Sequence, residues 1–288
     1  MTERVGRVAL VTHQLPAVSA EALVEVLSLL QAREVEVLLP PGERAKHPQL
    51  VPAGAVACCD ASREELAAAD LCLVLGGDGT MLRALRQTRD LGVPVVGINL
   101  GRVGFFAAVA RDAISTDLGR VLDGEYETHP LLGLAARLNG SDLRAVNDVS
   151  IGRGREGGIA RIGYALNDVA LFDVACDALI VSTPAGSSAY NLAIGGPVMG
   201  IGVDAFVLSY VAPHALGTRS LVAAANDVLA VTNQSEHDPA EVVVDGEHMG
   251  SLLPLASIVI HTVPALACLA LLPESSFYRQ FSDRFIRT

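Results

Sequence analysis

Lysine is almost missing from this chain. Among 288 residues and 21 basic side chains, Lys46 is the single lysine, and it lies in a segment rich in proline and glycine. The sequence therefore argues against chemistry that depends on a lysine in the site. This covers a Walker A nucleotide site, the strand lysine of a protein kinase and a pyridoxal Schiff base.

An excess of positive charge is missing as well. The chain carries 21 basic against 32 acidic residues, a formal net charge of −11. Nucleic acids and anionic membrane surfaces are bound through basic stripes that displace counterions, so we expect neither as a partner. Any phosphate ligand must then be held by a local site.

Long apolar runs are also lacking. The most apolar stretch, Ser257 to Leu272, contains His261 and Pro264 and falls short of the roughly 20 apolar residues that a membrane-spanning helix requires, so we interpret it as buried strands. The apolar run that follows Arg4 and Arg7 is too short for a signal-peptide core. We therefore expect a cytoplasmic protein.

Cysteines are few and are not spaced as metal ligands. Their number is odd, and no C-x-x-C pair is followed by a second pair of ligands, which predicts reduced, buried thiols. The five residues are Cys58, Cys59, Cys72, Cys176 and Cys268. The composition, with 51% hydrophobic residues, is otherwise that of a globular protein.

The first part of the chain alternates strand and helix patterns. Strand-like runs at 7–12, 34–39, 56–60, 71–75 and 93–98 are separated by helical patterns at 19–33, after the capping box Ser62-x-x-Glu65, and at 79–89. This alternation predicts a doubly wound parallel sheet of the α/β class. A further amphipathic segment, 112–122, ends at Asp123-Gly124.

The pattern changes after residue 124. Short alternating segments separated by turn residues run from Tyr126 to Leu272, with a convincing helical pattern only near 187–194. The last residues form an amphipathic pattern with Phe277, Phe281 and Phe285 on one side. We predict an α/β domain over 1–124, a β-rich domain over 125–275, and a C-terminal helix over 276–288 that packs back on the rest.

The strongest chemical signal is a glycine-rich turn between a strand and a helix. A buried strand from Leu71 runs into Gly76-Gly77-Asp78-Gly79-Thr80 and then into a helix. Ligands of α/β sheets bind at such carboxyl ends of strands, where glycines admit a ligand and free N–H groups suit phosphate. Asp78 would repel a phosphate unless it binds a cation, accepts a hydroxyl hydrogen bond or acts as a base. The alternative is a simple helix-capping aspartate.

A second strand, loop and helix pattern runs from Asp177 through Ser182-Thr-Pro-Ala-Gly186 to Tyr190-Asn191. Small hydroxylated residues around Gly186 can wrap a polar ligand, although an ordinary serine-rich helix start has the same composition. Two other patterns carry less weight. Gly152 to Gly157 matches G-x-G-x-x-G but is followed by a strand pattern, and Ser187 with His214 lacks the nucleophile elbow of a hydrolase.

In order along the chain, these and further motifs resemble those of the NAD kinase family. The resemblance rests on Gly-Gly-Asp-Gly-Thr at 76–80, Gly97 to Phe105, Asn147-Asp148, Ser182 to Asn191, Gly195-Gly-Pro197, Ala212-Pro-His214 and Asp245-Gly246. Diacylglycerol kinases, sphingosine kinases and phosphofructokinases resemble this chain only at the first of these motifs. A lipid or sugar kinase is therefore the weaker alternative.

The resemblance implies transfer of a phosphoryl group from ATP or polyphosphate to the adenosine-ribose 2′-hydroxyl of NAD, giving NADP. It also implies a divalent cation, and we expect magnesium. It implies that Asp78 is the general base and binds NAD. It assigns the donor's phosphates to Gly76, Gly77, Gly79 and Thr80. It assigns NAD binding to Gly79, Phe105, Asn147, Asp148, Asp177, Ser188, Ala189, Tyr190, Asn191, Ala212 and Glu247. It further implies a homodimer or homotetramer with contacts through the β-rich domain.

Several positions depart from the family's usual residues. Asp148 replaces the glutamate of the usual Asn-Glu pair and is one methylene shorter, Ala185 lacks a hydroxyl, and Glu247 replaces an amide. A catalytically weak NAD(P)-binding sensor of the same fold is therefore an alternative hypothesis. The repeated Asn167-Asp168 is a competing candidate for the ribose pair, but its position nine residues before Asp177 is typical of a hairpin turn.

Overall fold

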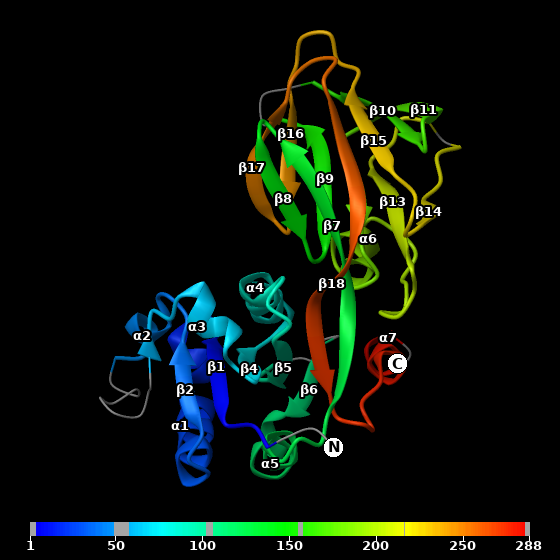
Figure 1. The fold of residues 1–288 in the computed structure, drawn as a ribbon. Coiled ribbons are helices and arrows are strands. Elements are labelled where there is room, and N and C mark those ends of the chain that lie inside the picture. The colour runs from blue at the N-terminus through cyan, green and yellow to red at the C-terminus, as the bar shows by residue number, and fades with distance from the viewer. Residues whose placement is uncertain (1–3, 49–57, 102–105, 155–157, 216, 286–288) are drawn as a thin grey trace. The chain divides into compact units, whose positions relative to one another are not determined.

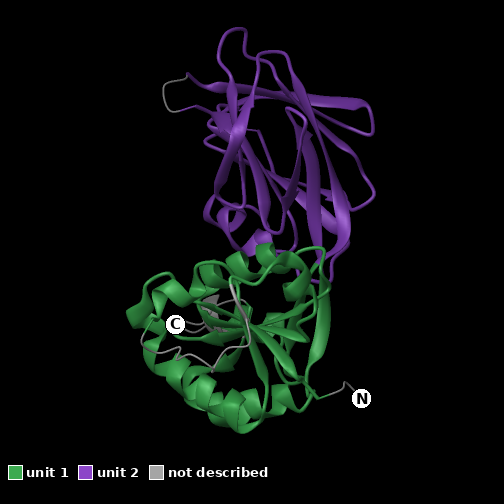
Figure 2. Ribbon diagram, turned by 60° about the vertical axis from the view of Figure 1, so that its left-hand side comes forward, with its two compact units in different colours: residues 1–130, 267–288 green, residues 131–266 purple. Residues whose placement is uncertain are grey.

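The computed structural model describes residues 4–48, 58–101, 106–154, 158–215 and 217–285. The chain divides into two compact units, one formed by 1–130 with 267–288 and the other by 131–266 (Figure 2). The division differs from the sequence-based one because residues 125–130 and 267–275 lie with the first unit instead of the β-rich one. Each unit has its own buried apolar cluster.

The first unit contains the predicted parallel sheet. Its strands are β1 (Arg7–Thr12), β2 (Glu36–Leu39), β3 (Cys58–Cys59), β4 (Leu71–Gly76), β5 (Pro94–Asn99) and β6 (Ala107–Ala110). They pair in parallel in the order β5-β4-β1-β2-β3, and β6 pairs with β5 (Figure 1). β4 is buried at every position, as its continuous apolar sequence predicts. The doubly wound parallel fold is thereby confirmed.

Helices connect these strands and cover both faces of the sheet. They are α1 (Pro16–Ala32), α2 (Glu43–Lys46), α3 (Arg63–Ala67), α4 (Asp78–Thr88), α5 (Gly119–Leu122) and α7 (Phe277–Phe285), with 3-10 and π turns at Arg111–Ala113 and Ile114–Leu118. α1 packs with the Ile114–Leu118 segment on one face, and α4 contacts β4 and β5 on the other (Figure 1). The predicted capping box at Ser62 is present. The rings of Phe277 and Phe281 lie 6.5 Å apart, on the predicted common side of α7.

The second unit is rich in β-strands, as predicted, and the strand pairs within it are antiparallel. Its strands are β7 (Glu127–Leu138), which begins in the first unit, β8 (Ser141–Ala145), β9 (Asp148–Arg153), β10 (Ala160–Leu166), β11 (Val169–Cys176), β12 (Ala178–Ser182), β13 (Ala205–Val211), β14 (Leu221–Ala224), β15 (Leu229–Asn233), β16 (Ala240–Val244), β17 (Glu247–Leu252) and β18 (Ser257–Leu271). One sheet has the order β14-β13-β12-β9-β16-β17. The only described helical turns here are a 3-10 turn at Gly186–Ser188 and α6 (Tyr190–Ala193), near the predicted position.

Strand β18 corrects the interpretation of the most apolar stretch. It is one strand of 15 residues, and its first half alternates between buried and exposed positions, with Val259 half exposed. Residues 257–260 pair with β15 of the second unit, whereas Cys268 and Leu269 pair with β5 of the first. Its last six residues, 266–271, are buried except for the partly buried Cys268, which accounts for their apolar character. In the first part of the strand, only alternate side chains reach the core.

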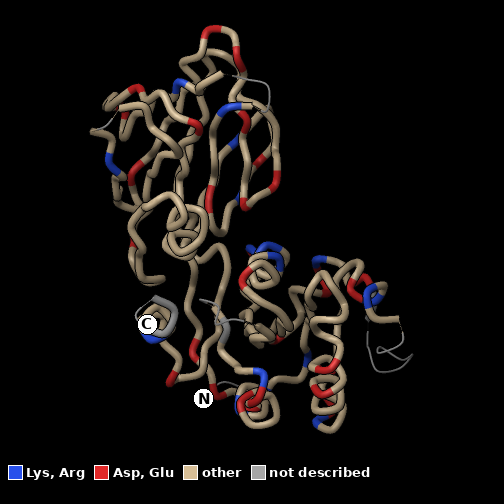
Figure 3. The backbone as a smooth tube through the Cα atoms, turned by 180° about the vertical axis from the view of Figure 1, so that it is seen from behind, with Lys and Arg blue, Asp and Glu red and all other residues tan. Residues whose placement is uncertain are grey.

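Charged residues are spread over both units. Figure 3 shows basic and acidic residues intermixed, and no continuous basic stripe is present among the residues described. Within the same residues, no helix is long and apolar enough to cross a membrane.

Candidate functional site

The glycine-rich turn lies at the carboxyl end of β4, as the sequence predicts. Gly76 is the last residue of β4, Gly77 is the N-cap of α4, and Asp78 is the first residue of that helix. Asp78 is therefore not the capping residue, and no side chain caps the helix. Its partly buried carboxyl lies at the helix N-terminus, where the helix dipole favours a negative charge.

The three glycines of the turn differ in what the fold demands of them. A Cβ at Gly76 would lie 2.4 Å from Oγ1 of Thr80, so packing excludes a side chain there. A Cβ at Gly77 or Gly79 would meet nothing within 4 Å, and the extended backbone of Gly77 is open to any residue. The fold does not require glycine at these two positions, and the space above them is open to a ligand.

A pocket of about 390 Å³ lies beside this turn. It is lined by His13, Gln14, Leu15, Gly77, Gly79, Thr80 and Arg83. Thr12 of β1 and Leu75 of β4 are register partners, so both strands end at the pocket. Helix α1 begins at Pro16 without a side-chain cap or an acid in its first turn, and α4 begins at Asp78. The N-termini of two helices thus lie at one place, and the positive ends of their dipoles suit a phosphate ligand.

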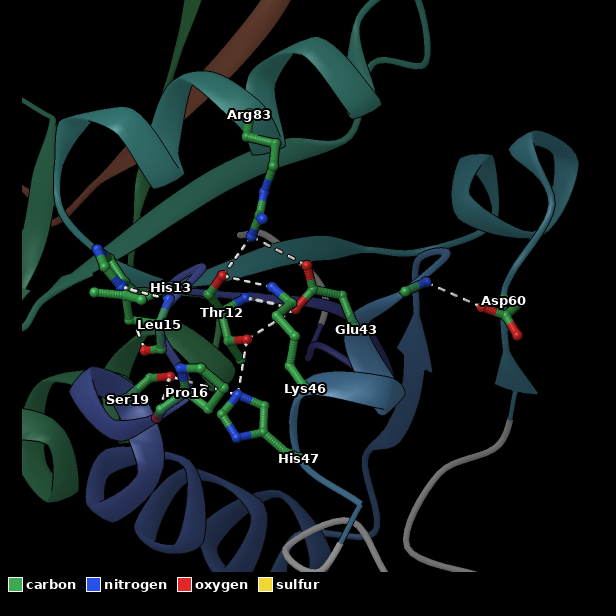
Figure 4. A network of polar contacts seen from close by, with 11 residues as sticks. Thr12, His13, Leu15, Pro16, Ser19, Glu43, Lys46, His47, Asp60 and Arg83 are labelled. Atoms are coloured by element: carbon green, nitrogen blue, oxygen red, sulfur yellow. Dashed lines mark hydrogen bonds and ion pairs between the residues drawn. The ribbon is translucent and has the colours of Figure 1, made fainter.

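Arg83 is a residue of this pocket that the sequence did not single out. It follows the glycine turn by one helical turn, and it supplies the positive charge that the glycine motif itself lacks. Its guanidinium forms an ion pair with the buried Glu43 at 3.1 Å. Lys46 also belongs to this cluster, although the sequence placed it in a loop (Figure 4). The sequence feature that could have identified Arg83 is its position three residues after Thr80, which places both residues on the same side of α4.

A second cluster forms around the Asn147-Asp148 bend in the other unit. The carboxylate of Asp245 accepts backbone N–H bonds from Val146, Asn147 and Asp148 at 2.9, 2.7 and 3.1 Å. Asp245 precedes Gly246 in a two-residue turn with positive φ at both positions, between β16 and β17. The Asn147-Asp148 and Asp245-Gly246 motifs, nearly 100 residues apart, therefore form one structure.

The Ser182 to Gly186 loop joins the same cluster. Thr183 donates its backbone N–H to the carbonyl of Asn147 at 2.9 Å and its hydroxyl to the carbonyl of Val146 at 2.7 Å. A Cβ at Gly186 would lie 2.1 Å from the Asn147 carbonyl oxygen. Gly186 is thus required for the loop to approach the bend, and these contacts hold the backbone of Asn147 in place.

Asp148 is a buried carboxyl next to a second one. Burial raises the pKa of Asp148, and the charge of Asp245 raises it further, to about 7. A carboxyl with such a pKa exchanges protons near neutral pH and can accept or donate a hydrogen bond to a sugar hydroxyl.

The residues predicted on the adenine side divide into two groups. Ser188 is partly buried, whereas Ala189 and Tyr190 are exposed and available to a ligand. Asn191 is fully buried: its amide nitrogen donates to the carbonyls of Ser187 and Pro197, and its oxygen accepts from Ser209. In this structure Asn191 therefore supports the loop from inside instead of facing a ligand.

Asp177 lies far from the Asn147-Asp148 bend. β9 and β12 are antiparallel, so Asp148 pairs with Ser182 at one end and Gly152 with Ala178 at the other. Asp177 precedes β12 at that other end and pairs with Arg153 at 3.1 Å. The backbone N–H of Asp177 donates to the carbonyl of Val211, next to Ala212, which is exposed. One β-strand length, on the order of 16 Å, separates this end from Asp148.

The last two predicted NAD-binding residues are Glu247 and Phe105. Glu247 is exposed at the start of β17, next to the Asp245-Gly246 turn and hence on the Asp148 side. Phe105 lies outside the described residues.

The competing patterns take structural roles. Asn167 and Asp168, with φ of 48° and 65°, form the two-residue turn between β10 and β11, as the hairpin interpretation predicts. The G-x-G-x-x-G match begins in β9, and the next described element is strand β10, so no helix opens there. Ser187 is fully buried and donates to the carbonyl of Pro184 at 2.6 Å, so it is not accessible as the nucleophile of a hydrolase.

Comparison with known proteins supports the family resemblance. The family described as the ATP-NAD kinase N-terminal domain matches residues 8–126, and the ATP-NAD kinase C-terminal domain matches residues 146–264. The NAD kinase of Heliobacterium modesticaldum is 36% identical over 227 residues, covering 77% of this chain and 80% of that protein. The NAD kinase of Symbiobacterium thermophilum is 32% identical over 262 residues, covering 88% and 89%.

Solved structures of the same kind share the fold. A yeast NADH kinase complexed with NADH has a TM-score of 0.85 at 19% identity, covering 99% of this chain and 88% of that one. An NAD kinase from Archaeoglobus fulgidus in complex with ATP has a TM-score of 0.72 at 23% identity, covering 96% and 98%. Since the two family descriptions span both units and relatives above 30% identity cover most of its length, the chain belongs to the NAD kinase family.

Proposed function

We propose that this protein transfers a phosphoryl group from ATP to the adenosine-ribose 2′-hydroxyl of NAD, with Asp78 as the general base. The observation that carries the proposal is the turn at the end of β4, where Asp78 stands between two glycines that the fold does not require. A carboxylate that takes the hydroxyl proton raises the nucleophilicity of the attacking oxygen. Phosphoryl transfer otherwise depends on positioning and on stabilising charge.

The donor's phosphates are proposed to lie in the pocket at the ends of β1 and β4. The N-termini of α1 and α4 and the guanidinium of Arg83 supply positive charge there, while Gly77 and Gly79 let the backbone approach. Polyphosphate offers the same chain of phosphate oxygens, so it is proposed as a second donor.

NAD is proposed to bind through Asn147 and Asp148, with Tyr190, Ala189 and Ser188 beside the adenine. The bend that carries Asn147 and Asp148 is held from two sides, by Asp245 and by the 182–186 loop, so the backbone from which its polar side chains project is preorganised. Asp177 and Ala212 are proposed to lie at the nicotinamide end of an extended dinucleotide, and their distance from this bend supports the proposal.

The other participants are proposed from general chemistry. Among the described residues, no group of three or more His, Cys, Asp or Glu side chains is arranged to hold a metal ion. Magnesium commonly binds through substrate phosphates with only one or two carboxylates, so we propose that it accompanies the donor. The exposed Val169 and Phe172 of edge strand β11 support a homodimer or homotetramer. We further propose that the protein acts in the cytoplasm.

The test is formation of NADP from NAD, ATP and Mg²⁺ by the purified protein, with polyphosphate in a parallel reaction. Asp78→Asn is expected to keep the fold and to lower turnover by about 10² to 10⁴, the range for loss of a general base. Far-UV circular dichroism checks the fold. Saturable NAD binding without NADP formation by the unmodified chain would instead identify a sensor, and near-normal turnover of Asp78→Asn would remove Asp78 from the mechanism.

A further inference from the structure

A cluster of charged side chains lies behind the pocket at the ends of β1 and β4 (Figure 4). At its centre is the carboxylate of Glu43, whose side chain is only 3% exposed. One oxygen of Glu43 lies 2.7 Å from Nζ of Lys46, and the other lies 3.1 Å from Nη2 of Arg83. A buried carboxylate thus joins the only lysine of the chain to the arginine of the pocket.

The end of β1 holds this carboxylate in place. Thr12 donates its backbone N–H at 3.0 Å and its hydroxyl at 2.8 Å to Glu43. Since that hydroxyl has a single proton, its oxygen accepts from Nε2 of His47, which lies 3.0 Å away. Glu43 therefore receives four donors in all, two from Thr12 and one each from Lys46 and Arg83, and its orientation is fixed.

The carbonyl oxygen of Thr12 completes the network. Lys46 donates to it at 2.9 Å, and Nη2 of Arg83 donates to it as well. Two cations are thereby gathered at the last residue of β1, immediately before pocket residue His13. Burial lowers the pKa of Lys46, Arg83 lowers it further, and Glu43 opposes both effects. Without the carboxylate, the two cations would repel each other.

Arg83 is the member of the cluster that reaches the pocket, where it lies with Gly77, Gly79 and Thr80. Both of its bonds to the network use Nη2, and its Nε is buried without a hydrogen-bond partner among the described residues. An arginine side chain has several rotatable bonds, and its guanidinium remains at one place only while partners hold it.

We propose that Glu43 is a positioning residue of the donor pocket: its carboxylate holds the Arg83 guanidinium against the end of β1, where that cation meets the phosphates of the donor. The inference rests on the proposed function, because it takes a nucleoside triphosphate as the occupant of this pocket. Glu43 itself does not touch the donor. Its effect on binding passes through Arg83.

The test uses the sign of the effect of Glu43→Gln on ATP binding, measured by calorimetry with Mg²⁺ and without NAD. Removing a negative charge near an anion site strengthens anion binding if charge alone matters. Loss of positioning does the opposite, and we expect roughly tenfold weaker ATP binding. The Michaelis constant for ATP should rise equally, with kcat and the Michaelis constant for NAD nearly unchanged.

The matched control is Glu36→Gln. Glu36 of β2 pairs with Arg7 at 2.6 Å in the same unit, half exposed and not among the pocket-lining residues. Its loss removes a glutamate–arginine pair and one negative charge, as Glu43→Gln does, and should leave ATP binding unchanged.

A double-mutant cycle tests the route through Arg83. In the Arg83→Met background, Glu43→Gln should weaken ATP binding no further. Equal or tighter ATP binding by Glu43→Gln with Arg83 intact would overturn the proposal, as would additive effects of the two substitutions.

A second variant covers the case in which Glu43→Gln melts below the assay temperature. Glu43→Asp keeps the charge but withdraws the carboxylate by one methylene, and unaltered ATP binding by this variant would also overturn the proposal. If the unmodified chain binds ATP but forms no NADP, the proposed kinase activity is contradicted. The calorimetric comparison of ATP binding still decides whether Glu43 positions Arg83.

Discussion

Some polar residues of this protein stabilise the fold, whereas others have a chemical character that the fold alone does not explain. Asp245 is explained by the fold, because its carboxylate accepts three backbone N–H groups that would otherwise be buried without partners. Asp148 is not explained in this way, because burial beside Asp245 destabilises its charged form. A residue that is unfavourable for the fold and lies at a candidate site indicates a role in binding the ligand.

The raised pKa of Asp148 gives a pH dependence of stability with a defined sign. Because the folded-state pKa of about 7 lies above the ordinary value of 3.8, the folded state holds the proton over this interval and the unfolded state does not. The free energy of unfolding contributed by this group therefore falls as pH rises from about 4 to about 7.

Asp148→Asn should remove this dependence. We expect the variant to gain on the order of 2–4 kcal/mol relative to the unmodified chain at pH 8, and little at pH 4. Urea unfolding of both proteins at the two pH values measures the difference. A gain of equal size at both pH values would show that Asp148 does not titrate in this interval.

At the scale of elements, the turn between β4 and α4 contains one glycine that packing requires and two that packing does not require. The same substitution at its three glycines has three expected outcomes. Alanine at Gly76 meets Thr80, alanine at Gly77 meets nothing, and alanine at Gly79 replaces a glycine inside a helix.

Gly77→Ala and Gly79→Ala should fold normally but bind ATP roughly 10- to 100-fold more weakly, the scale of one lost hydrogen bond to a charged ligand. Gly79→Ala should also be more stable, by up to about 1 kcal/mol, because alanine favours helix. Gly76→Ala is the opposite control, since it should lower the melting temperature. Calorimetry with ATP and thermal unfolding separate the two effects, and unchanged ATP binding at both Gly77 and Gly79 would place the donor elsewhere.

The elements were largely predictable from the sequence because local patterns determine them. The strand-helix alternation, the Ser62 capping box and the Asn167-Asp168 turn all follow from periodicity and turn chemistry. Helix α2 was missed because Pro40, Pro41 and Gly42 precede it and are typical of a loop. Side-chain direction was not predictable either. The composition of the 182–191 loop cannot show that Asn191 turns inward to Ser209 while Tyr190 stays exposed.

The site networks were the least predictable part, because they join residues distant in sequence. Glu43 and Arg83 are 40 residues apart, and Asp245 and Val146 are 99 apart. No periodicity connects such pairs, and only the folded chain brings them together. The sequence indicated the motifs, and the structure supplied the residues that hold them.

At the scale of the whole molecule, the division into units depends on the last stretch of the chain. The apolar cluster of the first unit includes Ala270 and Leu272, and Cys268 and Leu269 pair with β5. The apolar cluster of the second unit lies entirely within residues 134–260. The second unit is therefore continuous in sequence, whereas the first requires residues from both ends of the chain.

Fragments of the chain should unfold accordingly. A 131–266 fragment is expected to give one cooperative urea transition, because it retains its whole apolar cluster. A 1–130 fragment lacks Ala270, Leu272 and the strand beside β5, so it should unfold without cooperativity or at a much lower urea concentration. Joining 267–288 through a flexible linker to residue 1 of that fragment restores the missing strand and should restore a cooperative transition. Equal urea midpoints for 1–130 with and without 267–288 would show that the first unit folds without residues 267–288. That result would agree with the sequence-based prediction of a domain that ends at residue 124.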